Sequence, residues 1–356
     1  MAFVILDRSK LEKNYTYLDN LFKKNGIEWS IVSKLLCGSK ELLSVLLDFN
    51  INQICDSRVS NLKAIKELNP AVETVYIKPP AKRSIKSIVK YADISMNTEF
   101  DTIEMLSKAA KELKKIHKII IMIELGELRE GVMRDDFIRF YEKVFELDNI
   151  EVIGIGTNLS CMYGVLPNHD KLIQLSLYEQ LIEAKFSKHI KYVSGGSSVT
   201  IPLIFNNMLP KGINHFRVGE TLFLGTDVYH DSTFDGMEND VFILYSEIIE
   251  LIHKPNIPQG EMGSNVDGQK SSFDDNDLRH MSYRAIIDLG LLDVDFNHIY
   301  PQDDTLKIVG ASSDMIVVNL GENVNNYKVG DLIVFRMDYM GTLRVLNSKY
   351  IGKRVK

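Results

Sequence analysis

Short apolar runs alternate with amphipathic stretches along the first two thirds of the chain. β-Branched and aromatic residues in the runs suit buried strands, whereas the stretches between them repeat apolar residues at helical spacing. We expect eight strands, at residues 29–34, 51–56, 74–78, 93–97, 118–124, 150–158, 190–194 and 214–224. The expected helices lie at residues 39–49, 57–68, 82–91, 99–115, 135–147, 168–186 and 198–206.

This alternation predicts an α/β fold, a closed TIM-type (β/α)8 barrel. An open doubly wound sheet uses the same alternation with fewer strands, so the strand count favours the barrel. A strand at residues 3–7 and a helix at 8–25 precede the first of these strands. We therefore assign residues 1–235 to the barrel domain.

The pattern changes after residue 235. Strand-like runs follow without convincing helices between them, at residues 241–252, 282–289, 306–309, 316–320, 332–337 and 343–351. Residues 236–356 are therefore predicted to form a smaller, all-β C-terminal domain. Within it, residues 259–279 are rich in Gly, Ser, Asn and Asp, which predicts a long loop.

Composition argues against several classes of partner. The formal net charge of −6 gives no electrostatic reason to expect nucleic acid or an anionic membrane. The cysteines are too few and scattered for a disulfide framework or a zinc site, which favours a reducing compartment. No apolar run approaches the roughly 20 residues of a membrane span, and the first residues lack a signal-peptide pattern. We expect a cytoplasmic protein without a metal site.

Lys34 is the first candidate for chemistry. It stands where an apolar strand ends and before a helix begins. A lysine amine partly removed from water there loses some preference for its charged form and becomes nucleophilic towards an aldehyde. The alternative is a lysine at a strand end that extends into solvent.

The seventh and eighth expected strands end in segments suited to a phosphate. Paired glycines allow the backbone to approach an anion closely, and serines add hydroxyl donors beside a helix N-terminus. Barrels of this class often bind phosphate with the loops after these two strands. Each segment alone could be an ordinary glycine turn. The candidate residues for the cofactor are Ser194, Gly195, Gly196, Ser197, Arg217, Gly219 and Glu220.

An arginine follows the fifth expected strand. Arg129 lies between two glycines directly after an apolar run, although a solvated loop arginine would look the same. A nucleophilic amine, a phosphate cradle and two arginines at one barrel end would suit an aldehyde cofactor that carries a phosphate. This set predicts pyridoxal 5′-phosphate, bound as a Schiff base to Lys34.

These motifs resemble the alanine racemase-type family of pyridoxal-phosphate enzymes (fold type III) over nearly the whole chain. The resemblance implies that Lys34 binds the cofactor aldehyde and that Arg129 supports the phenolic oxygen and the substrate carboxylate. It also implies that Arg217 faces the pyridine nitrogen, and Asn158 stands where alanine racemases carry a histidine near that arginine. The chain is most similar to the ornithine racemase subgroup, in residues 93–97, 125–131, 193–196 and 348–351.

The resemblance implies a racemase, an isomerase that interconverts the L and D forms of a free amino acid, here ornithine or another basic one. It also implies a homodimer, because Ser313 and Asp314 fall in a segment that a partner subunit offers to the substrate carboxylate. An alanine or broad-specificity racemase, or a non-catalytic pyridoxal-phosphate carrier, is the alternative. Decarboxylases of this fold fit less well, because they carry a glutamate where Arg217 stands.

The sequence departs from the family motif at the residue that would act as the second acid/base. Racemisation needs proton donors on both faces of the substrate, and Lys34 serves one face. Alanine racemases supply the other from a tyrosine shortly after a Gly-Glu pair, but residues 260–268 of this chain contain no tyrosine. Cys161 and Tyr339 are the candidates that remain.

Overall fold

The computed structural model describes residues 2–264, 268 and 280–356. The chain divides into two compact units. One unit comprises Ser9–Asn239, and the other combines Met1–Arg8 with Asp240–Lys356.

The larger unit contains a parallel sheet whose strand order is β8-β7-β6-β5-β4-β3-β2-β10-β9. Only Gly195 separates β8 from β9 along the chain, so the two ends of the sheet meet and the barrel closes. Each of the eight expected runs overlaps one of its strands, which confirms the predicted barrel, and only the two-residue β9 lies outside those runs. The strands are β2 (Glu28–Val32), β3 (Gln53–Asp56), β4 (Glu73–Tyr76), β5 (Ile94–Asn97), β6 (His117–Met122), β7 (Ile150–Gly156), β8 (Tyr192–Ser194), β9 (Gly196–Ser197) and β10 (His215–Val218).

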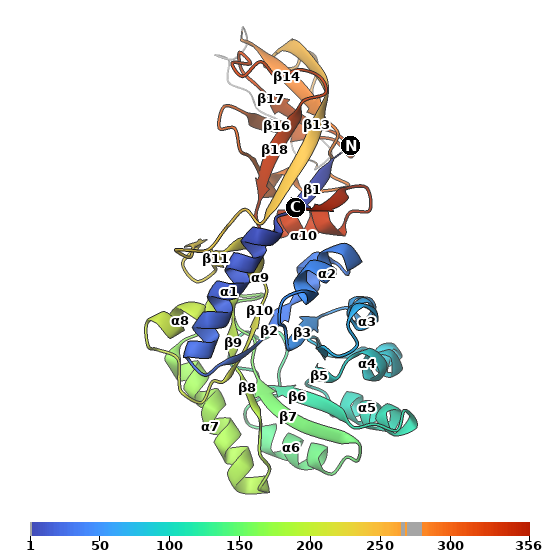
Figure 1. The fold of residues 1–356 in the computed structure, drawn as a ribbon, viewed down its shortest axis with the longest axis vertical. Helices are drawn as coiled ribbons and strands as arrows, with labels where there is room; N and C mark the ends of the chain where they lie inside the picture. The colour runs from blue at the N-terminus through green and yellow to red at the C-terminus, as the bar shows by residue number, and fades with distance from the viewer. Residues whose placement is uncertain (1, 265–267, 269–279) are drawn as a thin grey trace. The chain divides into compact units, whose positions relative to one another are not determined.

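Helices surround these strands (Figure 1). The strands pack their inner side chains into one apolar cluster that includes Val75, Ile94, Met96 and Ile120. Strands covered on both faces have near-continuous apolar sequences, which explains why the pattern was readable. The helices are α1 (Arg8–Lys24), α2 (Lys40–Leu47), α3 (Val59–Leu68), α4 (Ile85–Tyr91), α5 (Phe100–Glu112), α6 (Phe137–Phe145), α7 (His169–Phe186), α8 (Ile201–Phe205) and α9 (Glu220–Leu224).

The expected strand at 214–224 is only partly correct. Strand β10 stops at Val218, and α9 begins at Glu220 and ends before Gly225, which has a positive φ of 63°. Residues 222–224 are buried and apolar in the helix. A short apolar run of this kind does not distinguish a strand from a buried helix. A two-stranded ribbon of β11 (Thr226–Asp227) and β12 (Ser232–Thr233) follows.

The smaller unit is built on a second sheet, with the order β15-β18-β13-β14-β17-β16. Strand β1 (Phe3–Leu6) joins this sheet, antiparallel to β13 and parallel to β19 (Gly352–Val355). The prediction placed residues 1–8 in the barrel domain, whereas their pairing assigns them to this unit. The remaining strands are β13 (Phe242–Pro255), β14 (Met281–Ile287), β15 (Ile299–Pro301), β16 (Lys307–Ala311), β17 (Ile316–Asn319) and β18 (Leu332–Met337).

The last expected strand, at 343–351, is wrong. Residues Tyr339–Asn347 form helix α10, which begins where the Asp338 carboxylate accepts a 2.9 Å hydrogen bond from the Gly341 N–H. Val345 and Leu346 are buried and therefore look like strand residues in the sequence. The loop expected at 259–279 lies mostly outside the described residues. Among the residues that are described, no helix is long and apolar enough to span a membrane.

Candidate functional site

Lys34 lies at the carboxyl end of β2, in a short 3₁₀ helix (Ser33–Leu36). Its neighbours Leu35 and Leu36 are buried and anchor this turn in the barrel. Lys34 itself is an exposed residue. The strand ends two residues earlier than predicted, at Val32.

Gly219 brings the turn after β10 close to the lysine segment. Strands β10 and β2 are parallel neighbours, with Val218 opposite Ile31. A Cβ atom on Gly219 would lie only 3.1 Å from the Val32 carbonyl oxygen, two residues before Lys34. The absence of a side chain therefore permits this close approach.

Arg217, in β10, bonds to residues at the carboxyl ends of β7 and β8. Its side chain is 6% exposed. One terminal nitrogen, Nη1, donates to the Ser194 carbonyl at 2.8 Å and also to the Ser194 hydroxyl. The other, Nη2, donates at 2.7 Å to the Thr157 carbonyl and at 2.7 Å to Asn158 Oδ1. Burial lowers the pKa of Arg217. The acceptors of these four bonds are neutral, so the guanidinium charge is held in position without being cancelled by direct contact.

Glu130 connects this arginine to Arg129. Its carboxylate accepts a bidentate pair from Arg129, through Nε and through Nη2 at 2.6 Å, and a third hydrogen bond from Asn158 Nδ2. The hydrogen bonds that Arg129 donates to Glu130 are the main cause that raises the pKa of Arg129. The network thus runs from one arginine through a carboxylate and an amide to the other arginine. Sequence reasoning missed Glu130, although it directly follows Arg129 in the motif.

The glycine pair lies where a phosphate cradle was expected. A Cβ atom on Gly196 would approach the Phe216 ring to 2.2 Å, so no larger residue fits without rearrangement. The Ser197 N–H donates to Thr200 Oγ1 at 3.2 Å. Ser198 Oγ accepts from the Thr221 N–H at 3.3 Å, which links the loops after β9 and β10.

Ser194 and Glu220 have partners of their own. The Ser194 hydroxyl bonds to Arg217 and lies 2.6 Å from His215 Nδ1. Glu220 Oε1 accepts from Thr226 Oγ1 at 3.4 Å. The hydroxyl of Ser194 therefore acts on Arg217, whereas Gly195, Gly196 and Ser197 remain the predicted phosphate-binding residues.

A buried carboxylate organises the loop after β7. Glu127 is 1% exposed and accepts backbone N–H bonds of 2.9–3.1 Å from Ser160, Cys161, Tyr163 and Val165, and another from Met162. Burial alone would raise its pKa, but the backbone donors outweigh burial and lower the pKa to about 2. The loop carries Cys161, which is exposed and whose side chain also raises the pKa of Arg129. Sequence reasoning missed Glu127 as well.

Ser313, Asp314 and Tyr339 belong to the smaller unit. Ser313 Oγ donates to Asp314 Oδ1 at 3.1 Å in the turn between β16 and β17, and Tyr339 is the first residue of α10. Their roles stay predictions. Among the described residues, no cluster of His, Cys, Asp and Glu side chains could hold a metal ion.

Comparisons with known proteins give a consistent result. Residues 6–227 match the alanine racemase N-terminal domain family. The chain is 39% identical to an ornithine racemase of Acetoanaerobium sticklandii over 99% of both chains. It is 30% identical to a lysine racemase of Thermotoga maritima, over 98% of this chain and 97% of that one. An alanine racemase structure from Bartonella henselae with covalently bound pyridoxal phosphate covers 100% of this chain and 99% of its own, with a TM-score of 0.74 at 16% identity.

Proposed function

Because the chain belongs to the alanine racemase family, we propose that it is a pyridoxal-phosphate-dependent racemase of basic amino acids, with ornithine as the first substrate to test. The observation that carries this proposal is the similarity to an ornithine racemase along the full length of both chains. The relative named as a lysine racemase supports a substrate with a second amine. Both relatives are racemases, which favours proton exchange at Cα over other reactions.

The residues present fit the cofactor. A lysine at the carboxyl end of a strand suits an aldehyde, and the buried cation Arg217 suits the pyridine ring at the same end of the barrel, whereas the space beside Gly196 is filled by the Phe216 ring. Lys34 would bind the aldehyde, residues 195–197 with Gly219 and Glu220 would hold the phosphate, and Arg217 would face the pyridine ring. When bound, pyridoxal phosphate supplies an electron sink that acidifies the Cα proton of an amino acid.

The protein's own groups then determine which reaction follows. Arg217 is a buried cation, and a neighbouring positive charge disfavours a proton on the pyridine nitrogen. Arg217 would therefore limit how strongly the bound cofactor withdraws electrons, and proton exchange at Cα would remain the main reaction. Arg129 would hold the substrate carboxylate, and Lys34 would take or return the proton on one face. Cys161 and Tyr339 are the candidates for the opposite face.

The test combines cofactor binding with isotope exchange. The purified protein is loaded with pyridoxal phosphate, treated with borohydride and digested, and we expect the cofactor mass on the peptide that contains Lys34. In deuterium oxide, L-ornithine should lose its Cα proton and its optical rotation, and L-lysine should do so more slowly. Lys34→Ala should abolish both signals. A protein that binds the cofactor on Lys34 but exchanges no proton from any amino acid would be a carrier, and the proposed activity would be refuted.

A further inference from the structure

A chain of buried polar side chains leads from Arg217 to the opposite end of the barrel. Ser194 Oγ lies 2.6 Å from His215 Nδ1, and His215 Nε2 lies 3.1 Å from Gln53 Oε1. Gln53 Nε2 then donates to Glu73 Oε2 at 2.7 Å. Ser194 is the last residue of β8, whereas His215, Gln53 and Glu73 are the first residues of their strands. This hydrogen-bond chain therefore crosses the barrel from the carboxyl ends of the strands to their amino ends.

The partners determine the direction of every hydrogen bond. The Gln53 amide nitrogen is directed at Glu73, so Gln53 Oε1 faces His215 Nε2 and can only accept from it; in a neutral ring Nδ1 then accepts from the Ser194 hydroxyl. The ring proton is then on Nε2 and points to Gln53 Oε1. The amide nitrogen of Gln53 donates to the Glu73 carboxylate. Each donor in the chain thus points away from the cation and towards the anion.

Ser30 supports the same tautomer of His215. Its hydroxyl lies 3.3 Å from His215 Nε2 and donates its proton to the Phe216 carbonyl at 3.3 Å. It can therefore only accept from Nε2. Burial, with the positive charges of Arg217 and Lys191, lowers the pKa of His215 to about 3. The imidazole is accordingly neutral at physiological pH, and Arg217 remains the cation of the chain.

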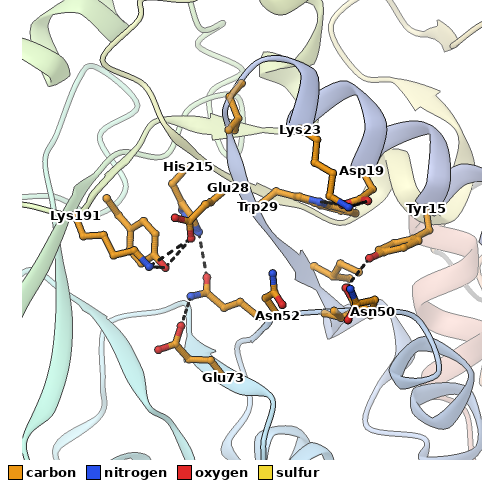
Figure 2. A pocket seen from close by; sticks show the side chains of 15 residues that line it. Tyr15, Asp19, Lys23, Glu28, Trp29, Asn50, Asn52, Glu73, Lys191 and His215 are labelled. Carbon is orange, nitrogen blue, oxygen red and sulfur yellow. Dashed lines mark hydrogen bonds and ion pairs between the residues drawn. The ribbon is translucent and has the colours of Figure 1, made fainter.

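The far end of the chain reaches a cavity of about 460 Å³ at the amino ends of the strands. The dashed lines between His215 and Glu73 in Figure 2 follow the last two bonds. Glu28 and Lys191 line the same cavity but bond to each other and to Tyr192. Glu73 is partly exposed there and pairs with Lys118 at 3.3 Å. The carboxylate end is thus hydrated, whereas the other members are buried.

We propose that Ser194, His215, Gln53 and Glu73 are positioning residues for Arg217, which they hold in the place and orientation that the pyridine nitrogen requires. This inference rests on the proposed function, since it assigns these residues a role towards the same cofactor. Hydrogen bonds in a low-dielectric interior polarise one another, so a chain aligned from cation to carboxylate is stronger than its separate bonds. Loss of the His215 acceptor frees the Ser194 hydroxyl to turn, and Arg217 loses a fixed acceptor.

The first experiment compares two buried histidines. His117 is the matched control, because it is buried, has a pKa lowered by burial to about 4 and lies 2.8 Å from the Ser95 hydroxyl, but has no bond to Arg217. With pyridoxal phosphate bound, His215→Leu should lower kcat about tenfold with little change in KM. A displaced Arg217 disfavours the proton on the pyridine nitrogen less. The pH of the change in cofactor absorbance should therefore rise by roughly one unit. His117→Leu should leave that pH unchanged.

Two further variants keep the test decisive if His215→Leu does not fold. His215→Asn retains an acceptor near the Nδ1 position and should recover part of the activity. Glu73→Gln removes the charge at the hydrated end and should move the absorbance transition in the same direction, by less. Glu28→Gln removes a carboxylate from the same cavity and should leave the absorbance transition unchanged. Equal transitions in wild type, His215→Asn and Glu73→Gln would overturn the proposal.

A cofactor-free measurement separates this inference from the proposed function. Long-range nitrogen–proton NMR of the histidine rings should show His215 neutral and protonated on Nε2 from pH 5 to pH 9. A charged ring, or a proton on Nδ1, would refute the hydrogen-bond chain even in an active racemase. If His215 shows the expected ring state but the protein binds no pyridoxal phosphate, the proposed function is refuted. The hydrogen-bond chain would then exist without its assigned role.

Discussion

Glu130 is a single carboxylate that serves both arginines of the site. It pairs with Arg129 directly and reaches Arg217 through Asn158, and its side chain is 11% exposed. Glu130→Gln keeps the size of the side chain but removes the charge, so Arg129 loses its ion pair and its fixed orientation. Because Arg129 is partly exposed, we expect a moderate effect, a loss of about tenfold in kcat/KM for ornithine, or about 1.4 kcal/mol.

The loss should appear mainly in KM, because Arg129 is assigned to the substrate carboxylate. Asp101→Asn is the control, since it makes the same change of charge in an exposed pair with Lys82. Steady-state kinetics with both enantiomers measures the effect. An unchanged KM in Glu130→Gln would show that Arg129 needs no carboxylate partner to act.

At the residue scale, the sequence marks candidates that stand beside glycines or at strand ends. Lys34, Arg129 and Arg217 were predicted as site residues in this way. Glu130 and His215 were not, because a charged residue in a loop and a polar residue in a strand are ordinary. The bond from His215 to Gln53 spans 162 positions of the chain, so no local pattern reveals it.

The loop after β7 depends on one ionised side chain. Glu127 satisfies five backbone donors of residues 160–165, and its pKa falls from 4.5 to about 2 in the folded state. A carboxyl group whose folded pKa is depressed stabilises the protein above its unfolded pKa. That contribution should be lost as the pH falls from about 4.5 towards about 2.

Glu127→Gln should therefore have a lower urea midpoint of unfolding than wild type at pH 6. The difference between the two midpoints should become smaller as the pH approaches 2. Urea titrations at several pH values measure this difference. Glu99→Gln is a control in another loop at the same end of the barrel, where no carboxylate bond of this kind is present among the described contacts. A gap that stays constant with pH would contradict the role of the ionised carboxylate.

Helices and strands were predictable where a single hydrophobic period dominated the sequence. The barrel strands are covered on both faces and showed as apolar runs, but residues 222–224 and 343–347 gave the same signal in helices. Burial of an apolar run is common to both elements, so only tertiary structure decides between them. Strand β15 has only three residues, and β19 has the sequence GKRV, which contains no apolar run, so neither was predicted.

At the scale of the whole molecule, the two chain ends belong together. Strand β1 pairs with β19, residue Phe3 opposite Gly352. The prediction extended the barrel to the first residue because sequence order is the only guide when pairing is non-local. The smaller unit is thus assembled from both termini, and the barrel forms from the continuous segment between them.

The homodimer that the family resemblance implies would share each active site between two protomers. Ser313 and Asp314 are exposed in a turn of the smaller unit, and the family resemblance assigns them to the substrate of a partner subunit. If so, a Lys34→Ala protomer and a Ser313→Ala/Asp314→Ala protomer are each impaired alone, but a mixed dimer contains one site with neither change. Random exchange makes half of the dimers mixed, so activity should return to about a quarter of wild type. Sedimentation velocity confirms dimers in each sample, and a mixture of Lys34→Ala with itself is the control. Dimers that exchange subunits but regain no activity would show that these residues act within their own chain or not at all, because complementation requires only that each site draw on both protomers.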